Sequence, residues 1–152
     1  MFRFLQKQAG TTIMNVSSLA HIAIAVKDLE KARLQYAVLG FHLSEPQPLP
    51  EHGVTVCFIK LPNVLIELLE PLGKNSPIEK FLEKNPEGGL HHLCFRVSDI
   101  HDTQTILQKK GYRILDTEEP KLGSHNLPVL FSHPKDFGGV LIEFEEKPED
   151  IS

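Results

Sequence analysis

The chain contains an internal duplication. The segment AHIAIAVKDLEKARLQYAVLGFHL, which starts at Ala20, matches the segment HHLCFRVSDIHDTQTILQKKGYRI, which starts at His91, at one constant offset. A second repeated motif follows these segments: the tetrapeptide VLIE occurs at 64–67 and again at 140–143. A repeat of this kind predicts two equivalent structural units that pack against each other.

The duplication places metal-binding residue types in duplicate. His21 corresponds to His92, and Glu67, the last residue of the first VLIE, corresponds to Glu143 in the second. A single strand glutamate is most often an exposed residue, but an unpaired carboxylate within an apolar strand would be costly to bury. Imidazole and carboxylate are common metal ligands, and a pseudo-two-fold would bring both copies to one centre. We therefore predict a metal site formed by His21, Glu67, His92 and Glu143.

Each copy opens with a strand pattern that leads into a helix pattern. Apolar residues alternate along residues 21–26, Asp28 can cap the helix that follows, and Gly40 can end it. The second copy repeats this order with Asp99 and Gly111. The two copies therefore predict the same strand–helix unit twice.

The alternation also decides which histidines face the metal site. We expect the helix to cover the more apolar face of the first strand, which carries Ile22 and Ile24, so His21 lies on the uncovered face. By the same alternation His92 lies on the uncovered face of the second unit, and His91 lies on the helix-covered face. The sequence therefore predicts that His92, and not His91, is a ligand.

Three shorter strands are expected after each helix, separated by turns that contain proline and glycine. The predicted fold class is α+β, with two tandem βαβββ modules that form a curved mixed sheet around a metal-binding cleft. Between the modules, the sequence Ser76-Pro77-Ile78-Glu79 has the pattern of a capping box and predicts a linker helix capped by Ser76. The shorter strands are expected at residues 41–45, 55–61, 64–69, 112–118, 127–133 and 139–145.

The chain is expected to form a single domain between two flexible tails. Its N-terminal stretch is basic, contains no acidic residue and lacks the apolar core of a secretory signal. The expected location is cytoplasmic, and it becomes the mitochondrial matrix if this stretch is a presequence. The predicted parts are an N-terminal tail (1–18), the domain (19–146) with module one (19–72), linker helix (75–88) and module two (89–146), and a C-terminal tail (147–152).

Composition excludes several functions. The formal charge of −4 and a pI near 6.0 provide no basic face, which argues against a nucleic-acid partner. No apolar run approaches the ~18 residues that a membrane span needs, so no membrane partner is expected. Cys57 and Cys94 lie in apolar runs without metal or redox spacing, and we expect both to be core residues in a reducing compartment.

Other polar residues give weaker indications. Arg96 shares the alternation of the uncovered face and is a candidate for binding a carboxylate. Lys135 is either a contact for an anionic substrate group or a solvated turn residue. Four other histidines are expected on the surface: His42, His52, His101 and His125.

The ligand set also narrows the choice of metal. Structural zinc usually has more sulfur or nitrogen ligands in a closed tetrahedron. Two oxygen donors suit a labile ion with room for water or substrate. The expected cofactor is one divalent ion, and Co²⁺, Zn²⁺, Ni²⁺, Mn²⁺ and Fe²⁺ are all candidates.

These features resemble a known superfamily. Paired strand–helix–three-strand modules with a His/Glu metal site are similar to the vicinal oxygen chelate proteins, which include glyoxalases, extradiol dioxygenases and antibiotic-resistance proteins. The chain most resembles the methylmalonyl-CoA epimerase family, and the run from SPIEKFLEKN into GLHH is the most specific part because glyoxalases lack this linker. The matching segments are HIAIAVKDLEKA at His21, ELLEPLGKNSPIEKFLEKN at Glu67, GGLHHLCFRVSDI at Gly88 and FSHPKDFGGVLIE at Phe131.

The resemblance implies a reaction and a ligand set. The reaction is the interconversion of the (R) and (S) epimers of methylmalonyl-CoA, by metal-assisted removal and return of the proton next to the thioester. The implied substrate is an acyl-CoA, and a homodimer is expected. The family's metal ligands fall on the four residues that the repeat predicts: His21, Glu67, His92 and Glu143.

One departure from the family concerns the second base. The resemblance implies Glu143 as one base, and some epimerases carry another glutamate three residues after the glycine equivalent to Gly53. This chain has Val56 there. We therefore predict Glu67 as the second base. The alternative is that Glu67 only binds the metal and that a water supplies the second proton.

Three other functions compete with epimerisation. The first is a glyoxalase I-type lactoylglutathione lyase, which uses similar ligands and acts on a glutathione hemithioacetal. The second is a non-catalytic binding or resistance protein, but the presence of all four candidate ligands argues against it. The third is an iron dioxygenase, which normally uses two histidines and one carboxylate.

Overall fold

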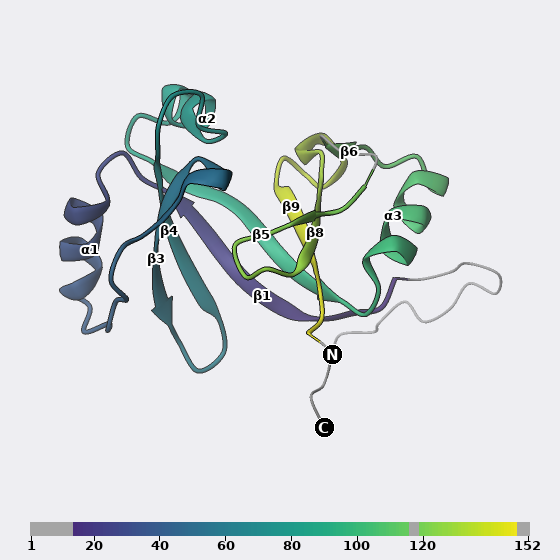
Figure 1. The fold of residues 1–152 in the computed structure, drawn as a ribbon, viewed down its shortest axis with the longest axis horizontal. Coiled ribbons are helices and arrows are strands. Elements are labelled where there is room, and N and C mark those ends of the chain that lie inside the picture. The colour runs from purple at the N-terminus through teal and green to yellow at the C-terminus, as the bar shows by residue number, and fades with distance from the viewer. Residues whose placement is uncertain (1–13, 116–118, 149–152) are drawn as a thin grey trace.

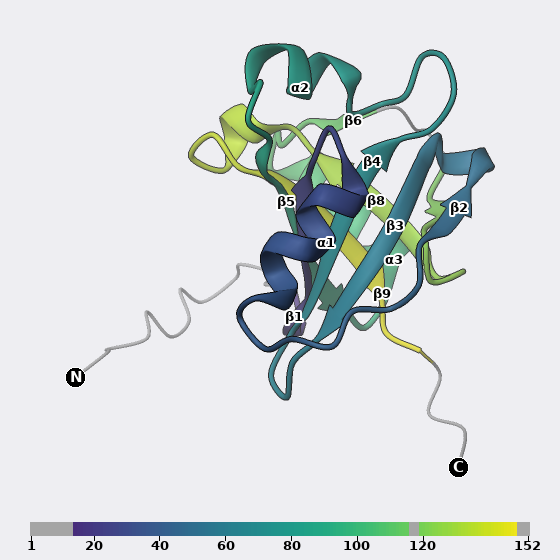
Figure 2. The ribbon, with the colours of Figure 1, turned by 90° about the vertical axis from the view of Figure 1, so that its left-hand side faces the viewer.

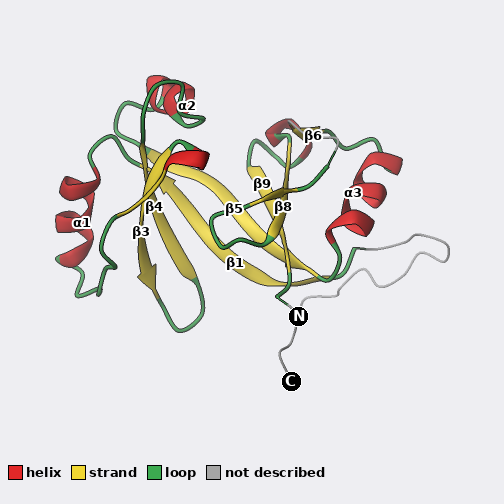
Figure 3. Ribbon diagram, viewed as in Figure 1, coloured by secondary structure: helices red, strands yellow, loops and turns green. Residues whose placement is uncertain are grey.

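The computed structural model describes residues 14–115 and 119–148. These residues form one curved mixed sheet with helices α1 and α3 at its two ends and α2 above it (Figures 1 and 3). The predicted α+β architecture is confirmed. The strands are β1 (Val16–Ala25), β2 (Gln47–Leu49), β3 (Val54–Lys60), β4 (Leu65–Pro71), β5 (Gly89–Val97), β6 (Ile114–Leu115), β7 (Lys121–Leu122), β8 (Pro128–Ser132) and β9 (Leu141–Glu146), and the helices are α1 (Leu29–Ala37), α2 (Glu79–Lys84) and α3 (Ile100–Lys109).

The strand order shows the two modules side by side. The order is β2-β3-β4-β1-β5-β9-β8-β6, and β7 pairs with β8. In module one, β1 runs parallel to β4 and β4 antiparallel to β3; in module two, β5 runs parallel to β9 and β9 antiparallel to β8. The modules join where β1 and β5 pair antiparallel. The same connection is therefore built twice around a pseudo-two-fold at this seam.

The register of the strands follows the repeat. Glu67 lies opposite Ala23 in the β4–β1 pair, and Glu143 lies opposite Cys94, the repeat equivalent of Ala23, in the β9–β5 pair. At the seam, Ala23 faces His92, and His21 faces Cys94. In the repeat, Ala23 corresponds to Cys94 and His21 to His92. A rotation about the pseudo-two-fold therefore converts one of these pairs into the other.

Three register shifts interrupt the seam, and two of them are equivalent bulges in the repeat. The register shifts between Leu19 and His21 and again between Ala23 and Ile24, so the extra residues are Ala20 on β1 and His91 on β5. A bulge turns a side chain out of strict alternation and is often found beside active sites. The bulge brings His91 to the cavity that His92 also lines. The prediction that His91 lies on the helix-covered face is therefore wrong.

Helices α1 and α3 begin and end as the sequence predicts. Asp28 accepts a hydrogen bond from the amide of Lys31 at 2.9 Å, and Asp99 caps α3 in the same way at 2.8 Å. Gly40 and Gly111, with φ of +85° and +81°, follow the helices in the left-handed conformation that glycine adopts without strain.

A second acidic residue contacts each helix start. The Leu29 amide donates to Glu70 at 2.9 Å, and the Ile100 amide donates to Glu146 at 2.9 Å. Glu70 and Glu146 each lie three residues after a candidate ligand, Glu67 or Glu143. The last strand of each module therefore both carries a site glutamate and binds the N-terminus of that module's helix.

Apolar packing separates the two faces of module one. Helix α1 covers the face that carries Ile24 and Val26, as predicted, and packs there with the buried residues Ile59 and Leu68 (Figure 2). The opposite face is covered by the linker segment. Its buried cluster comprises Ala23, Ala25, Val54, Val56, Leu69, Ile78 and Leu82.

Several predicted elements differ in the structure. The strand expected at 41–45 is reduced to one bridge, Leu43 to Ile59, because the Ser44 hydroxyl takes the Phe58 amide that a ladder would use. β2 forms later, at Gln47–Leu49. Of the strand expected at 112–118, only β6 is present among the described residues, and 116–118 lie outside them.

The linker helix is shorter than predicted and lacks the predicted cap. α2 starts at Glu79 without a side-chain cap. Ser76 is buried instead, and its hydroxyl donates to the Gly53 carbonyl at 2.6 Å, which ties the linker to module one. The capping box prediction is therefore wrong, because this tertiary contact takes the hydroxyl.

The domain boundaries remain predictions, with one difference at the start of the fold. β1 begins at Val16, so the sheet starts three residues before the expected boundary at residue 19. Residues 1–13 of the expected N-terminal tail and 149–152 of the C-terminal tail lie outside the described residues.

Candidate metal centre

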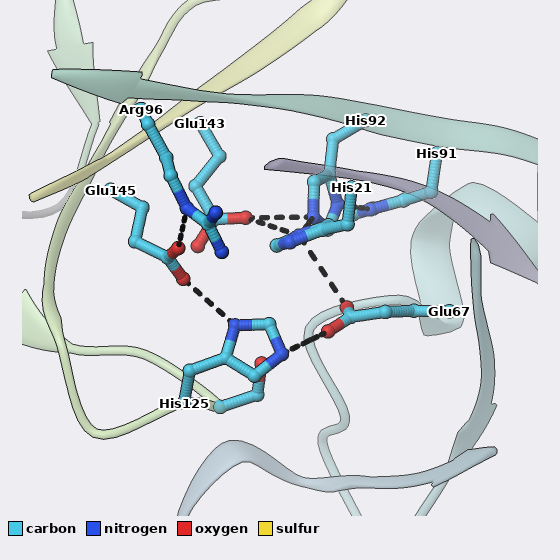
Figure 4. A network of polar contacts seen from close by, with 9 residues as sticks. His21, Glu67, His91, His92, Arg96, His125, Glu143 and Glu145 are labelled. Atoms are coloured by element: carbon cyan, nitrogen blue, oxygen red, sulfur yellow. Dashed lines mark hydrogen bonds and ion pairs between the residues drawn. The ribbon is translucent and has the colours of Figure 1, made fainter. Parts of the chain in front are cut away.

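The four predicted ligands lie together in the middle of the sheet (Figure 4). The Nε2 atoms of His21 and His92 are 3.2 Å apart, and each is 2.9 Å from Oε2 of Glu143. Oε2 of Glu67 is 3.5 Å from Nε2 of His21. All four side chains are buried, with 1% to 7% of each residue exposed.

The sheet explains this convergence. His21 and His92 come from the paired central strands β1 and β5, and the two glutamates come from the parallel neighbours β4 and β9. Because Glu67 and Glu143 occupy equivalent register positions, each reaches the seam from its own side. Figure 4 shows Glu143 and Glu67 approaching His21 from different directions.

The centre favours positive charge. Burial alone would raise the pKa of Glu143, but its hydrogen bonds with His21 and His92 outweigh burial and lower the pKa to about 2. Burial likewise opposes a charge on His21, yet Glu143 and Glu67 raise its pKa. The buried, ionised carboxylate of Glu143 therefore requires a compensating positive charge, which a protonated His21 or a bound cation can supply.

The distances fit a single bound cation. Metal bonds to imidazole nitrogen and carboxylate oxygen are about 2.0–2.2 Å, so neighbouring ligand atoms around one ion lie roughly 3 Å apart. The contacts of 2.9, 3.2 and 3.5 Å that join His21 to Glu143, His92 and Glu67 have this spacing, and ligand atoms of His21, Glu67 and His92 all lie within 4.8 Å of one another. Two neutral imidazoles and two carboxylates would also neutralise a divalent charge. The residues present therefore fit a divalent ion.

The two histidines differ in what holds their other nitrogen. Nδ1 of His92 lies 2.9 Å from Nδ1 of His91. Burial, followed by the neighbouring His92, lowers the pKa of His91 to about 4, so His91 is neutral. Nδ1 of His21 is buried and has no hydrogen-bond partner among the described residues. His91 thus contacts a candidate ligand from outside the set, and its ring packs edge-on against Phe81 of the linker helix.

A second network lies behind Glu67. Its Oε1 accepts a hydrogen bond from the Ser124 hydroxyl at 3.1 Å and lies 3.4 Å from Nε2 of His125. Nδ1 of His125 is 2.8 Å from Oε2 of the buried Glu145, whose other oxygen accepts from Arg96 Nε at 3.3 Å. The hydrogen bond with Glu145 raises the pKa of His125. Arg96 therefore binds a carboxylate, as expected, but that carboxylate belongs to the protein.

Parts of this network were not predicted from the sequence. His125 was expected on the surface and lies in the site, because the turn that carries it folds over Glu67. Nothing in the turn sequence indicates this. Glu145 could have been found, because it lies two residues after Glu143 and shares its strand face. His52 was also expected on the surface, but it lines the cavity described next.

A cavity of about 350 Å³ opens onto the centre. Glu67, His92 and Glu143 contribute its polar lining, together with His91 from the bulge. Its remaining wall is mostly apolar and includes Val54, Val56, Leu69, Ile78, Val129, Phe131 and Leu141.

The other candidate residues lie outside the cavity or within the core. Lys135 is exposed in a short turn after β8, and His42 and His101 are exposed as predicted. Cys57 and Cys94 are both buried and unpaired, which confirms them as core residues. Burial and the nearby Glu143 raise the pKa of the Cys94 thiol, so it stays protonated. None of the helices in the described residues is long and apolar enough to span a membrane.

Comparison with known proteins identifies the class. Residues 20–131 match the model of the glyoxalase/bleomycin resistance protein/dioxygenase superfamily, and the chain belongs to this superfamily. Within it, the chain belongs to the methylmalonyl-CoA epimerase family. It is 55% identical over 132 residues to the ethylmalonyl-CoA/methylmalonyl-CoA epimerase of Cereibacter sphaeroides, covering 86% of this chain and 98% of that protein. It is 51% identical over 140 residues to the mitochondrial methylmalonyl-CoA epimerase of Homo sapiens, covering 91% and 79%.

Solved structures agree with this assignment. A Streptomyces coelicolor methylmalonyl-CoA epimerase in complex with 2-nitronate-propionyl-CoA superposes with a TM-score of 0.78 and 32% identity, covering 88% of this chain and 99% of that one. The methylmalonyl-CoA epimerase of Mycobacterium tuberculosis gives a TM-score of 0.78 and 33% identity, covering 96% of both chains.

Proposed function

We propose that this chain interconverts the (R) and (S) epimers of methylmalonyl-CoA by moving the proton on the carbon next to the thioester. The observation that carries the proposal is the buried centre of two imidazoles and two carboxylates at the wall of a cavity, in a chain about half identical to named epimerases. The Cereibacter relative is also named for ethylmalonyl-CoA, so ethylmalonyl-CoA is a second candidate substrate.

His21, Glu67, His92 and Glu143 would hold one divalent ion, with Co²⁺, Zn²⁺, Ni²⁺ and Mn²⁺ as candidates. The spacing of their ligand atoms supports this assignment. When bound, the ion supplies Lewis acidity worth several kcal/mol, which makes the α proton easier to remove. The apolar wall of the cavity excludes water from the reacting carbon.

Glu143 and Glu67 are the proposed proton-transfer groups. An epimerase removes a proton from one face of the carbon and returns one to the other, so two groups on different sides of the substrate are the simplest design. Glu143 and Glu67 reach the centre from β9 and β4, on the two sides of the seam. Val56 is buried and apolar, so that position offers no carboxylate.

Lactoylglutathione lyase activity is the weaker alternative. The chain is 29% identical over 121 residues to the lactoylglutathione lyase of Schizosaccharomyces pombe and covers only 40% of that protein. The Cereibacter epimerase is closer in sequence, and the match covers 98% of its length. An acyl-CoA is therefore the proposed substrate.

The deciding experiment is proton exchange. Incubation of one methylmalonyl-CoA epimer with the protein in D₂O should give deuterium at the α carbon and the opposite epimer. Removal of the metal with a chelator should stop both processes, and a divalent ion should restore them. Conversion of the methylglyoxal–glutathione adduct without any effect on methylmalonyl-CoA would overturn the proposal in favour of the lyase.

A homodimer and a cytoplasmic location are further proposals. The exposed apolar side chains of Leu34, Val38 and Leu39 support association, because soluble monomers rarely expose such groups together. The unpaired, buried Cys57 and Cys94 support a reducing compartment. Sedimentation of the purified chain tests the first proposal, and cell fractionation tests the second.

A further inference from the structure

The turn that carries His125 belongs to module two but serves the glutamate of module one. It connects β7 to β8 and is closed by the hydrogen bond from the Asn126 amide to the Gly123 carbonyl at 3.0 Å. A Cβ on Gly123 would approach Val129 to 2.7 Å, so only glycine lets the turn lie this close to β8. The turn is thereby held against the site.

His125 is anchored from behind. Its Nδ1 donates to Glu145, which is only 1% exposed and is also bound by Arg96. Its ring packs at 5.5 Å, centroid to centroid, against His21 and at 5.9 Å against Phe58. These contacts leave the ring little freedom to rotate, so its Nε2 has a defined direction.

That direction is toward Glu67. Nε2 of His125 and the Ser124 hydroxyl both approach Oε1 of Glu67, at 3.4 and 3.1 Å. The other oxygen, Oε2, faces His21 at 3.5 Å. Each carboxylate oxygen therefore has its own partners: Ser124 and His125 lie at Oε1, and Oε2 faces the centre (Figure 4).

We propose that His125 is a positioning residue for Glu67: held by Glu145, it fixes the carboxylate so that Oε2 is presented to a divalent cation. The inference rests on the proposed function in one respect, namely that Glu67 is a metal ligand. Residues that orient a ligand from outside typically change metal affinity or activity 10–100-fold when they are replaced. His125 should therefore affect metal binding without touching the metal.

The test uses two substitutions of His125, each of which keeps one of the two polar contacts that the imidazole makes. In His125→Gln the amide reaches the position of Nε2 and can still donate to Glu67. In His125→Asn the amide reaches only the position of Nδ1 and keeps the contact with Glu145. His101→Asn, at an exposed position on α3, is the matched control. Each full-length protein is freed of metal and titrated with Co²⁺ by calorimetry and visible absorption.

The two substitutions should differ in their effect on metal binding, because only the contact with Glu67 orients the ligand. His125→Asn should weaken Co²⁺ binding 10–100-fold and alter the cobalt absorption bands, whereas His125→Gln should stay within about threefold of the unchanged protein. Glu145→Gln, which loosens the anchor without removing the ring, should weaken binding in the same direction. This second variant keeps the test valid if His125→Asn does not fold by circular dichroism.

Two outcomes would overturn different statements. Unaltered affinity and spectrum in both His125→Asn and Glu145→Gln would overturn the positioning role and leave the metal site standing. Failure of the unchanged protein to bind one Co²⁺ per chain would instead overturn the metal site itself. Epimerisation adds a kinetic signature, because a positioning defect should lower kcat while the KM for methylmalonyl-CoA stays nearly constant.

Discussion

Glu67 and Glu143 occupy equivalent positions in the two modules but have different surroundings. Glu143 directs one oxygen at both imidazoles, at 2.9 Å each. Glu67 stands farther from His21, at 3.5 Å, and its second oxygen is bound by Ser124 and approached by His125. The duplication therefore sets where the backbone delivers each carboxylate, and the turn of module two sets how one of them is held.

The histidines show the same division. Both follow an equivalent bulge, but the bulged residue is Ala20 in module one and His91 in module two. Consequently Nδ1 of His92 has a partner and Nδ1 of His21 has none among the described residues. Divergence after the duplication has placed the residues that support the site mainly in module two.

Removal of either histidine ligand should have the largest effect on metal binding and epimerisation, and this effect should be equal in the two modules. His21→Ala and His92→Ala should each abolish saturable binding of a divalent ion and reduce epimerisation by at least ~10²-fold, since even indirect partners of a ligand account for 10–100-fold. Metal content after dialysis and initial rates are the measurements. His91→Ala is the control and should still bind one ion per chain at saturation. Full occupancy in both ligand variants would rule out the shared site.

Glutamine substitutions should reveal the difference between the glutamates. Glutamine can still ligate but cannot take a proton, so Glu67→Gln should keep its metal, exchange the α proton of one epimer with D₂O, and lose interconversion by at least ~10²-fold. Glu143→Gln should instead spare exchange of the other epimer. Mass spectrometry of each epimer gives the exchange. Near-normal interconversion by metal-loaded Glu67→Gln would leave Glu143 as the only base.

The repeat was sufficient to predict that these four side chains meet, because each of them lies on a strand that fixes its direction locally. His21, Glu67, His92 and Glu143 were each assigned to a predicted strand from the sequence. The four side chains converge because the pairing of β1 with β5 is symmetric. The α+β class, the helix caps and the face covered by α1 followed from the same local signals.

The supporting residues were not predictable, because they depend on contacts between distant segments. The position of His125 follows from a turn 58 residues beyond Glu67, and nothing local marks it. His91 was assigned to the wrong face because a bulge breaks the alternation, and Ser76 was assigned to a cap that it exchanges for a contact with Gly53. Side-chain patterns indicate the face of a regular strand but give no sign of a bulge or a folded turn.

Substitution of His91 tests the difference between the two ligand histidines, of which only His92 has a partner for its Nδ1 among the described residues. For His92 to offer Nε2 to a metal, its Nδ1 must carry the proton and donate it to His91, which orients the ring. His91→Ala should therefore raise the metal Kd about tenfold while leaving the stoichiometry unchanged. His91→Asn can still accept from His92 and should recover much of the loss. Calorimetric titration measures both, and equal Kd values in His91→Ala and the unchanged protein would show that the two ligand histidines are equivalent after all.

The smallest effect is expected on stability, from the glutamate that contacts the start of the helix in each module. Glu70 and Glu146 each accept the first amide of their module's helix at 2.9 Å, and a carboxylate at a helix N-terminus is favoured by the helix dipole. Glu70→Ala and Glu146→Ala should each lower the free energy of unfolding by about 1 kcal/mol, with metal content unchanged. Urea denaturation of the metal-free proteins measures this, and the two values should agree within about 0.5 kcal/mol because the contacts are equivalent. A large loss from one variant and none from the other would mean that the modules are equivalent in backbone position but not in how their helices are held. Similar losses would show that the duplication is preserved in the scaffold, while the two sides of the metal centre have diverged.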